Sequence, residues 1–188
     1  GDRALDMALI VSDRPCNVAG VFTQNQFPAA PVLFDKAALA ANPRAIRAVV
    51  INAGNANACT GSQGLADAAS TARLVETAAG LPEGSALVLS TGVIGLPLPM
   101  EKIEAGVREA ANLARSETGQ SAEGLALAAQ AIMTTDTKPK TASRQVGQAT
   151  VLGIAKGAAM LHPNMATLLA VVVSDAAVEP DALQAMLR

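Results

Sequence analysis

The scarcity of aromatic side chains is the feature of this sequence that most restricts its fold. Hydrophobic residues make up 51% of the 188-residue chain, aromatic residues make up 2%, and Trp and Tyr are absent. The interior must therefore be filled by Ala, Val, Leu and Ile, which allow helices and sheets to approach closely. A chain of this length can bury one substantial core, or two small lobes that share one.

The charges exclude several classes of partner. Lys and Arg number 14 and Asp and Glu number 16, which gives a formal net charge of -2, and the two signs are interspersed. The sequence has no basic stripe for nucleic acid, no polybasic membrane patch and few aromatics for base stacking. No apolar stretch reaches the ~20 residues that span a bilayer. Residues 1–3 do not resemble a signal peptide, so we expect a cytoplasmic protein without nucleic-acid or membrane partners.

Cysteine and histidine offer little catalytic chemistry. Cys16 and Cys59 are far apart and form no Cys-x-x-Cys motif, so neither a zinc site nor a redox pair is indicated and we expect both thiols to be buried. His162 is the sole histidine, and it precedes a proline, where a side chain more often serves the geometry of a turn.

The hydrophobic pattern predicts a mixture of hairpins and helices, which is an α+β fold. A β-hairpin is expected at 141–154, and the strand at 45–51 should be buried on both faces along 48–51. The other expected strands, beginning with an antiparallel group, are 4–11, 18–24, 31–34, 86–90 and a buried strand at 168–173. Helices are expected at 36–41, 65–79, 99–114, 122–133 and 180–187.

One segment offers an unusual nucleophile. Residues 156–167 read Lys-Gly-Ala-Ala-Met-Leu-His-Pro-Asn-Met-Ala-Thr, and a continuous apolar run follows at 168–173. If the bond between Ala166 and Thr167 is cut, Thr167 becomes the first residue of a new chain. Its α-amine, with a pKa of about 7.7 to 8.0, could then take the proton of its own hydroxyl during attack. One residue would supply both the nucleophile and the base.

This segment resembles the processing site of the ornithine acetyltransferases, the glutamate N-acetyltransferases of arginine biosynthesis. Their pattern is roughly Lys-Gly-x-Gly-Met-x-x-Pro-x-Met-Ala-Thr-Met-Leu. The resemblance covers nearly the whole chain, because further stretches match the family in order, at 5–13, 19–25, 52–61, 90–95 and 132–137. The chain departs from the pattern at Ala159, where the family generally has glycine. If that position needs a positive φ, alanine would strain the turn and slow self-cleavage.

The resemblance implies a self-processing acyltransferase of the N-terminal-threonine type, with helices layered over packed β-sheets. Residues 1–166 would belong to the first chain and residues 167–188 would begin the second. The remainder of the second chain, which this sequence lacks, would supply a glutamate and further substrate contacts. The implied assembly is a heterotetramer of two first and two second chains.

The resemblance also implies a reaction and roles for individual residues. Acetyl would pass from N-acetyl-L-ornithine to Thr167, releasing ornithine, and then to L-glutamate. This reaction would need no metal and no organic cofactor. Thr91 and Gly92 would stabilise the oxyanion, and Lys156 and Thr137 would position the substrate. Some relatives also accept acetyl-coenzyme A, and the sequence does not decide whether this protein does.

Two of these motifs have plainer interpretations. The Ser-Thr-Gly run at 90–92 is also typical of a glycine-rich strand exit. The Asn- and Gly-rich segment at 52–61 usually means a tight turn, and it lacks the lysine and spacing of a phosphate-binding loop. By the resemblance it would help to shape the pocket near the nucleophile.

Lys156 and the threonine-rich run at 134–137 also have more than one interpretation. A lone lysine such as Lys156 is usually solvated, but the apolar residues that follow argue for partial burial and a paired role, either toward a substrate carboxylate or toward the oxyanion. The run at 134–137 could cap a helix, and Thr134 remains an alternative to Thr137 as the substrate contact.

Two other functions remain open. The chain could belong to a related self-processed aminopeptidase or amidase, in which water replaces glutamate as the acceptor. It could also be a catalytically silent fragment that serves as an assembly or ligand-binding module. Competition between acceptors separates the two enzymes, and the intact mass of the protein tests the silent module.

Overall fold

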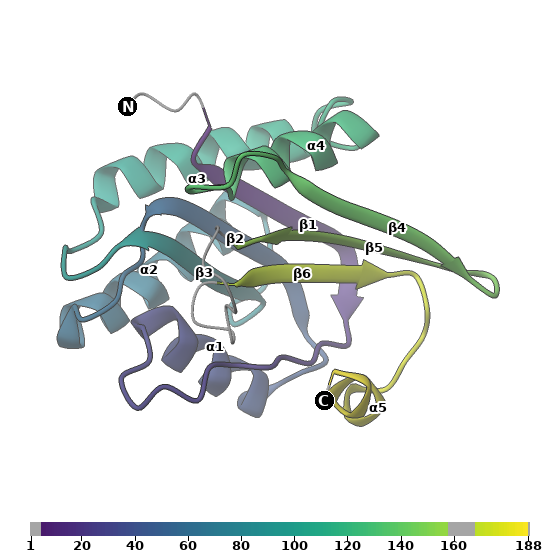
Figure 1. Cartoon of the computed structure of the whole chain (residues 1–188), viewed down its shortest axis with the longest axis horizontal. Coiled ribbons are helices and arrows are strands. Elements are labelled where there is room, and N and C mark those ends of the chain that lie inside the picture. The colour runs from purple at the N-terminus through teal and green to yellow at the C-terminus, as the bar shows by residue number, and fades with distance from the viewer. Residues whose placement is uncertain (1–4, 158–167, 188) are drawn as a thin grey trace.

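The computed structural model describes residues 5–157 and 168–187. In these residues the chain forms two three-stranded sheets and five helices, an α+β arrangement of helices over packed sheets (Figure 1). This confirms the fold class expected from the sequence. None of the described helices is long and apolar enough to cross a membrane.

The first sheet contains β1 (Met7–Cys16), β2 (Ile46–Asn55) and β3 (Ala86–Val93), in the order β1-β2-β3. β1 runs antiparallel to β2, and β2 runs parallel to β3. The central strand β2 is buried along most of its length, as the apolar run at 48–51 predicts. Because β2 and β3 are parallel, their carboxyl ends lie at the same edge of the sheet, with Ala53 opposite Thr91.

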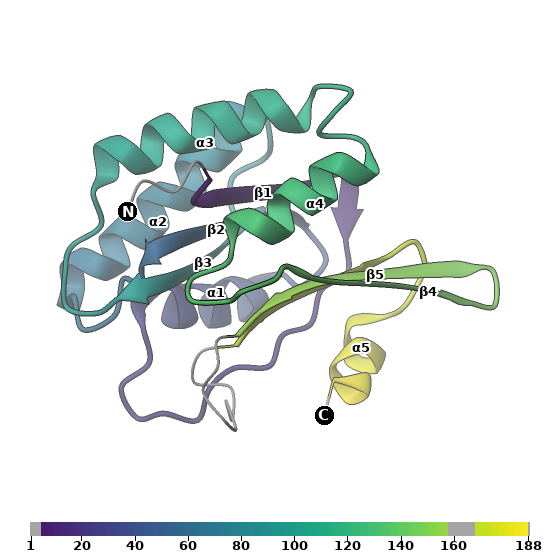
Figure 2. The same ribbon diagram turned by 45° about the horizontal axis from the view of Figure 1, so that its top comes forward.

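Three helices cover one face of this sheet (Figure 2): α1 (Ala30–Ala41), α2 (Gly61–Ala79) and α3 (Met100–Ala114). Small and aliphatic side chains fill the core beneath them, as the composition requires. The buried members are Ala48, Val50, Ala72, Val75, Ala86, Val88, Leu98, Ile103 and Val107. α2 ends where the sequence predicts, because Gly80 adopts a left-handed conformation with φ of 68°.

A second sheet packs against the opposite face. It contains β4 (Lys140–Val146), β5 (Ala149–Lys156) and β6 (Leu169–Ser174), all antiparallel in the order β4-β5-β6. The predicted hairpin is thereby confirmed as β4 and β5. Together with α4 (Ala122–Ala131), this sheet encloses a second core whose buried residues are Ala8, Ile51, Ala129, Ala131, Ile132 and Ile154.

The C-terminal helix α5 (Pro180–Met186) is held to the first half of the chain by the segment that precedes it. The Asn17 side-chain amide donates to the Val178 carbonyl at 2.8 Å, and Arg44 pairs with Glu179. The long-range contacts fix the start of α5 near the end of α1, where a pocket lies between them.

Two expected strands are wrong. Residues 31–34 form the first turn of α1, since Pro31 stands at the start of the helix, where its fixed φ is favourable and its missing N–H is harmless. Residues 18–24 form no strand. Val18 donates its backbone N–H to the Pro43 carbonyl at 2.8 Å, so the segment is tied to a loop and not to a sheet. Short apolar runs of this kind do not distinguish strand from helix by periodicity.

Three burial predictions are also wrong. Cys16 is half-buried and Cys59 is exposed. β6, predicted to be a buried strand, lies at the edge of its sheet and leaves Val172 61% exposed.

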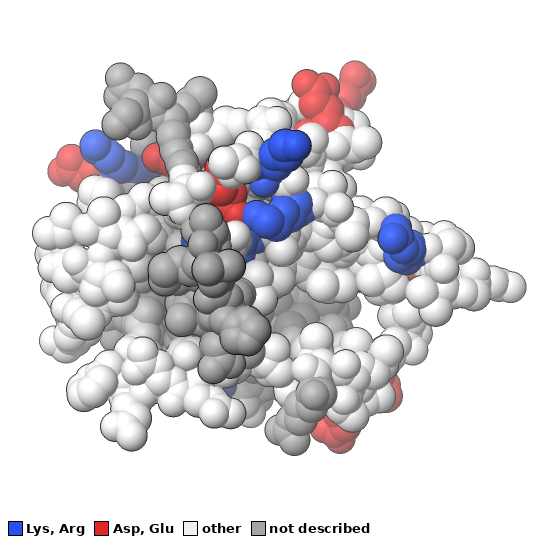
Figure 3. Space-filling view, viewed as in Figure 1, with Lys and Arg blue, Asp and Glu red and all other residues white. Residues whose placement is uncertain are grey.

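On the face drawn in Figure 3, basic and acidic side chains form small separate groups with no continuous basic stripe.

A buried carboxylate joins α1 to the outer strand of the first sheet. Asp35 is 5% exposed and accepts a hydrogen bond from the Val88 backbone N–H at 2.9 Å. Burial raises the pKa of Asp35 to about 7, and the hydrogen bond from Val88 offsets only part of that effect. The folded protein therefore holds this proton at pH values where the unfolded chain has released it.

Replacing Asp35 with Asn should stabilise the protein at alkaline pH. The contribution of Asp35 to wild-type stability falls as the pH rises from 3.8 to about 7, because at this group the folded state binds more protons than the unfolded state in that range. The Asp35→Asn variant does not titrate and still offers Val88 an oxygen. Its advantage over wild type should grow with pH to on the order of a few kcal/mol. Urea denaturation at acidic and alkaline pH measures it, and an advantage independent of pH would contradict this explanation.

Candidate active site

The candidate site lies at the carboxyl ends of β2 and β3, where the lack of a side chain on Gly92 allows the two strands to approach closely. Gly54 and Gly92 are partners in the ladder. Gly92 has a φ of 137°, and a Cβ placed on it would lie 2.2 Å from the carbonyl carbon of Gly54. No other residue type fits this position, so the bend directly after Thr91 depends on Gly92.

Asparagine side chains hold this edge of the sheet. The Ser90 hydroxyl donates to Asn52 Oδ1 at 2.6 Å, and the Asn52 amide donates to the Asn55 carbonyl at 2.8 Å. The Asn55 amide in turn reaches the carbonyls of Leu96 and Pro97 at 3.1 and 3.0 Å. The expected turn at 52–61 is therefore wrong for its first four residues, which continue β2. Their side chains fix the exit of β2 against the loop that follows β3.

A second polar centre stabilises the rest of this loop. Asn57 is fully buried and has a φ of 46°, a left-handed conformation that asparagine tolerates better than most residues. Its amide donates to the Gly64 carbonyl at 2.8 Å, and its oxygen accepts from the Thr60 hydroxyl at 2.7 Å. These bonds anchor the loop to the start of α2.

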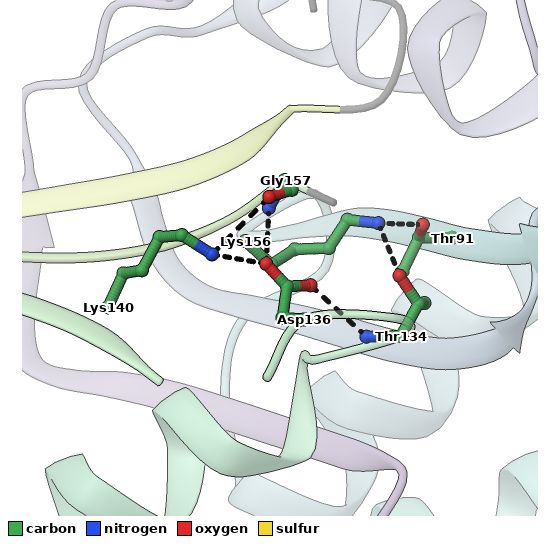
Figure 4. A network of polar contacts seen from close by, with 6 residues as sticks. All are labelled: Thr91, Thr134, Asp136, Lys140, Lys156 and Gly157. Carbon is green, nitrogen blue, oxygen red and sulfur yellow. Dashed lines mark hydrogen bonds and ion pairs between the residues drawn. The ribbon is translucent and has the colours of Figure 1, made fainter. Parts of the chain in front are cut away.

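Lys156 brings a positive charge from the second sheet to this site. It is the last residue of β5 and is 2% exposed. Its Nζ donates to Thr91 Oγ1 at 2.6 Å and to Thr134 Oγ1 at 3.1 Å (Figure 4). Burying an ammonium group is costly unless it is hydrogen-bonded. These two hydroxyls, one from β3 and one from the chain after α4, satisfy part of that requirement.

The direction of the Lys156 hydrogen bond has a chemical consequence. An ammonium group is a donor only, so Thr91 Oγ1 accepts and its own proton remains available for another acceptor. A hydroxyl that accepts from a cation becomes a stronger donor itself. The Thr91 hydroxyl is thus suited to stabilise a developing negative charge.

A carboxylate fixes the chain on either side of Lys156. Asp136 Oδ1 accepts from the Gly157 N–H at 3.1 Å and Oδ2 accepts from the Thr134 N–H at 3.4 Å. Lys140 forms an ion pair with Asp136 and also donates to the Gly157 carbonyl at 3.3 Å. Burial acts to raise the pKa of Asp136, but the hydrogen bonds from Lys140, Gly157 and Thr134 outweigh it and lower that pKa to about 2. The group is therefore ionised at ordinary pH.

The structure brings together some of the predicted site residues. Thr91, Gly92 and Lys156 lie together, and Thr134 is the threonine that contacts Lys156. Thr137 is exposed. The remaining predicted positions lie outside the described residues: Ala159, His162, Ala166 and Thr167.

Sequence reasoning missed the role of Asp136. The available signal was its spacing of four residues from Lys140 and its place among the threonines after a helix. No pattern in the sequence indicates that its carboxylate reaches Gly157. Within the described residues, no group of three or more His, Cys, Asp or Glu could hold a metal ion.

The family of the chain follows from comparison with known proteins. The ArgJ family model matches residues 1–188, so the chain belongs to the ArgJ family. It is 48% identical over 188 residues to the arginine biosynthesis bifunctional protein ArgJ of Thermotoga neapolitana, covering 97% of this chain and 45% of that protein. It is 50% identical over 189 residues to the ArgJ protein of Geobacter sulfurreducens, covering 98% and 46%. The chain thus spans less than half the length of these relatives.

Two solved structures are similar over most of the chain. One is the ArgJ protein of Bacillus halodurans, with a TM-score of 0.68 and 31% identity, covering 87% of this chain and 83% of the other. The second is an ornithine acetyltransferase complexed with ornithine from Mycobacterium tuberculosis, with a TM-score of 0.70 and 37% identity, covering 87% and 84%. The layered fold is therefore that of solved members of the family.

Replacing Gly92 with Ala should distort the site and destabilise the protein. The new methyl group would overlap the Gly54 carbonyl carbon, and the backbone conformation is unfavourable for alanine, so we expect a loss of about 2–5 kcal/mol in the free energy of unfolding. Gly147 is the matched control. It has a φ of 61° and open space around it, so Gly147→Ala should cost only about 1–2 kcal/mol. Equal losses in urea denaturation would show that the approach of Gly54 and Gly92 is unimportant.

Proposed function

We propose that this chain belongs to a self-cleaving amino-acid N-acetyltransferase that moves acetyl from N-acetyl-L-ornithine to L-glutamate in arginine biosynthesis. The observation that carries the proposal is the contact of 2.6 Å between the buried Lys156 ammonium and the Thr91 hydroxyl. It provides a preorganised donor at a glycine-dependent strand end. Membership of the ArgJ family supports this reaction class, since one solved relative is an ornithine acetyltransferase complexed with ornithine.

The proposed nucleophile is Thr167, released as a chain terminus by hydrolysis of the Ala166–Thr167 bond. Thr167 immediately precedes Leu168 in the sequence, and Leu169 is the ladder partner of Lys156. The covalent link to β6 supports the proposal, because it keeps Thr167 close in sequence to the strand that pairs with Lys156. With its amine freed, Thr167 can act as both nucleophile and base.

The reaction then runs in two halves. The Thr167 hydroxyl attacks the acetyl carbon of N-acetylornithine while the Thr167 amine takes its proton. The Thr91 hydroxyl and the Gly92 N–H stabilise the oxyanion, and a preorganised donor of this kind is typically worth ~3 kcal/mol. Collapse breaks the carbon–nitrogen bond, and the proton passes to the departing ornithine. The glutamate amine then attacks the acetyl-threonine ester and gives a proton to the Thr167 amine. Cleavage of the ester carbon–oxygen bond releases N-acetylglutamate, and the same proton restores the Thr167 hydroxyl.

The remaining roles are part of the same proposal. Residues 1–166 form the first chain and residues 167–188 begin the second, whose remainder completes the site with a glutamate and the heterotetramer of two first and two second chains. Thr137 or Thr134 contacts the substrate together with Lys156. Acetyl-coenzyme A is a second possible donor, and the cytoplasm is the expected compartment. The reaction needs no cofactor.

A difference in chain length among the relatives supports processing. This chain covers 84% of the Mycobacterium tuberculosis chain but 45% of the Thermotoga neapolitana protein. The solved chain is therefore much shorter than the curated relative. Cleavage of a family precursor into two chains would produce such a difference.

The full-length protein should convert N-acetylornithine and labelled glutamate into labelled N-acetylglutamate. Thr167→Ala should abolish both cleavage and transfer, because it removes the hydroxyl while leaving the backbone in place. Intact mass spectrometry measures cleavage, and chromatography of the labelled product measures transfer. Thr141→Ala, which changes an exposed threonine of β4, is the control and should behave as wild type.

Each alternative gives a different result in this assay. Release of acetate in preference to N-acetylglutamate would indicate the amidase or aminopeptidase reading, in which water is the acceptor. A single uncut chain that transfers no acetyl would favour the silent assembly or ligand-binding module. Sustained transfer by Thr167→Ala would eliminate Thr167 as the nucleophile.

A further inference from the structure

The β4–β5 ladder stops just before the site, and beyond its end side chains form hydrogen bonds with the backbone. The last ladder pair joins Lys140 to Ala155. Beyond it, the Gly157 N–H donates to Asp136 at 3.1 Å and the Gly157 carbonyl accepts from Lys140 at 3.3 Å. An ion pair thus binds both polar groups of one residue, directly after Lys156 in the chain (Figure 4).

The same carboxylate also holds a hydrogen-bond partner of the Lys156 side chain. Asp136 Oδ2 accepts from the Thr134 N–H at 3.4 Å, and the Thr134 hydroxyl accepts from Lys156 Nζ at 3.1 Å. Asp136 therefore reaches Lys156 by two routes, through the backbone of Gly157 and through Thr134. Its side chain is fully shielded from solvent, whereas the Lys140 side chain is 51% exposed.

We propose that Asp136 is a positioning residue of the active site, which sets the Lys156 ammonium against the Thr91 hydroxyl by fixing Gly157 and Thr134 together. The lysine side chain is a flexible four-carbon stem, so a contact of 2.6 Å with Thr91 requires a fixed backbone and fixed partners. The effect of Asp136 on catalysis rests on the proposed function, but its effect on Lys156 does not.

The test uses Asp136→Asn in the full-length protein. Asparagine keeps the size and one acceptor oxygen, but it cannot hold Lys140 by charge and places an amide where an acceptor is needed. We expect kcat to fall about tenfold to a hundredfold, since small misplacements of catalytic groups have effects of this size. KM should change by less than about threefold. Labelling of Lys156 with an amine-reactive reagent, located by peptide mass spectrometry, should become several times faster.

Asp175→Asn is the matched control, because Asp175 performs similar chemistry at the opposite end of β5. Its carboxylate accepts from the Thr150 N–H at 2.7 Å. The control should leave kcat and the labelling of Lys156 as in wild type. Equal effects of both variants would show that Asp136 only supports the strand, and would overturn the inference.

Asp136→Glu separates positioning from general stability. Glutamate restores the charge that pairs with Lys140 but displaces the carboxylate oxygens by one methylene. We therefore expect Asp136→Glu to have a higher free energy of unfolding than Asp136→Asn, while its kcat stays below that of wild type. A variant as stable and as active as wild type would overturn the inference.

The two proposals fail in different ways. If wild type transfers acetyl while Asp136→Asn keeps normal kcat and normal protection of Lys156, the inference fails and the proposed function stands. If wild type transfers no acetyl, the labelling rates still decide whether Asp136 holds Lys156, since faster labelling supports the inference and unchanged labelling overturns it.

Discussion

The buried ammonium group of Lys156 is the constraint on which the site depends. It belongs to the second sheet but donates to the Thr91 hydroxyl at the end of a strand of the first sheet. Because an unpaired buried charge is very unfavourable, both sheets and the chain after α4 must be in place before this lysine can be accommodated. The fold therefore places the Lys156 ammonium beside the Thr91 hydroxyl. The proposed catalysis uses this same contact, which the buried ammonium needs for its own stability.

The small size of the core residues makes this approach of the sheets possible. Ala8 of β1 and Ala129 and Ala131 of α4 lie in the core between the first sheet, the second sheet and α4. Larger side chains at these three positions would push the layers apart and move Lys156 away from Thr91. Within the first sheet, Gly92 has no side chain where β3 approaches the backbone of Gly54. The lack of Trp and Tyr in the composition is thus consistent with the geometry of the site.

The sequence predicts those features that rest on local patterns. The helix ending at Gly80, the buried strand β2 and the β4–β5 hairpin follow from periodicity and turn residues. The strand expected at 18–24 is wrong because the partner of this segment is a loop that no local pattern identifies. Thr91 and Lys156 stand out by motif, but their contact joins residues 65 positions apart. The contact of Asp136 with Gly157 was not predicted for the same reason, since it joins residues 21 positions apart.

The location of the acetyl group during the reaction tests the role of Thr167. The full-length enzyme is incubated with N-acetylornithine in the absence of glutamate, quenched, and analysed by peptide mass spectrometry. We expect a second chain that begins at Thr167, carries acetyl on the hydroxyl of that residue and loses it when glutamate is added. An enzyme that transfers acetyl with the Ala166–Thr167 bond intact, or that carries the acetyl group on another residue, would show that the terminal Thr167 is not the nucleophile.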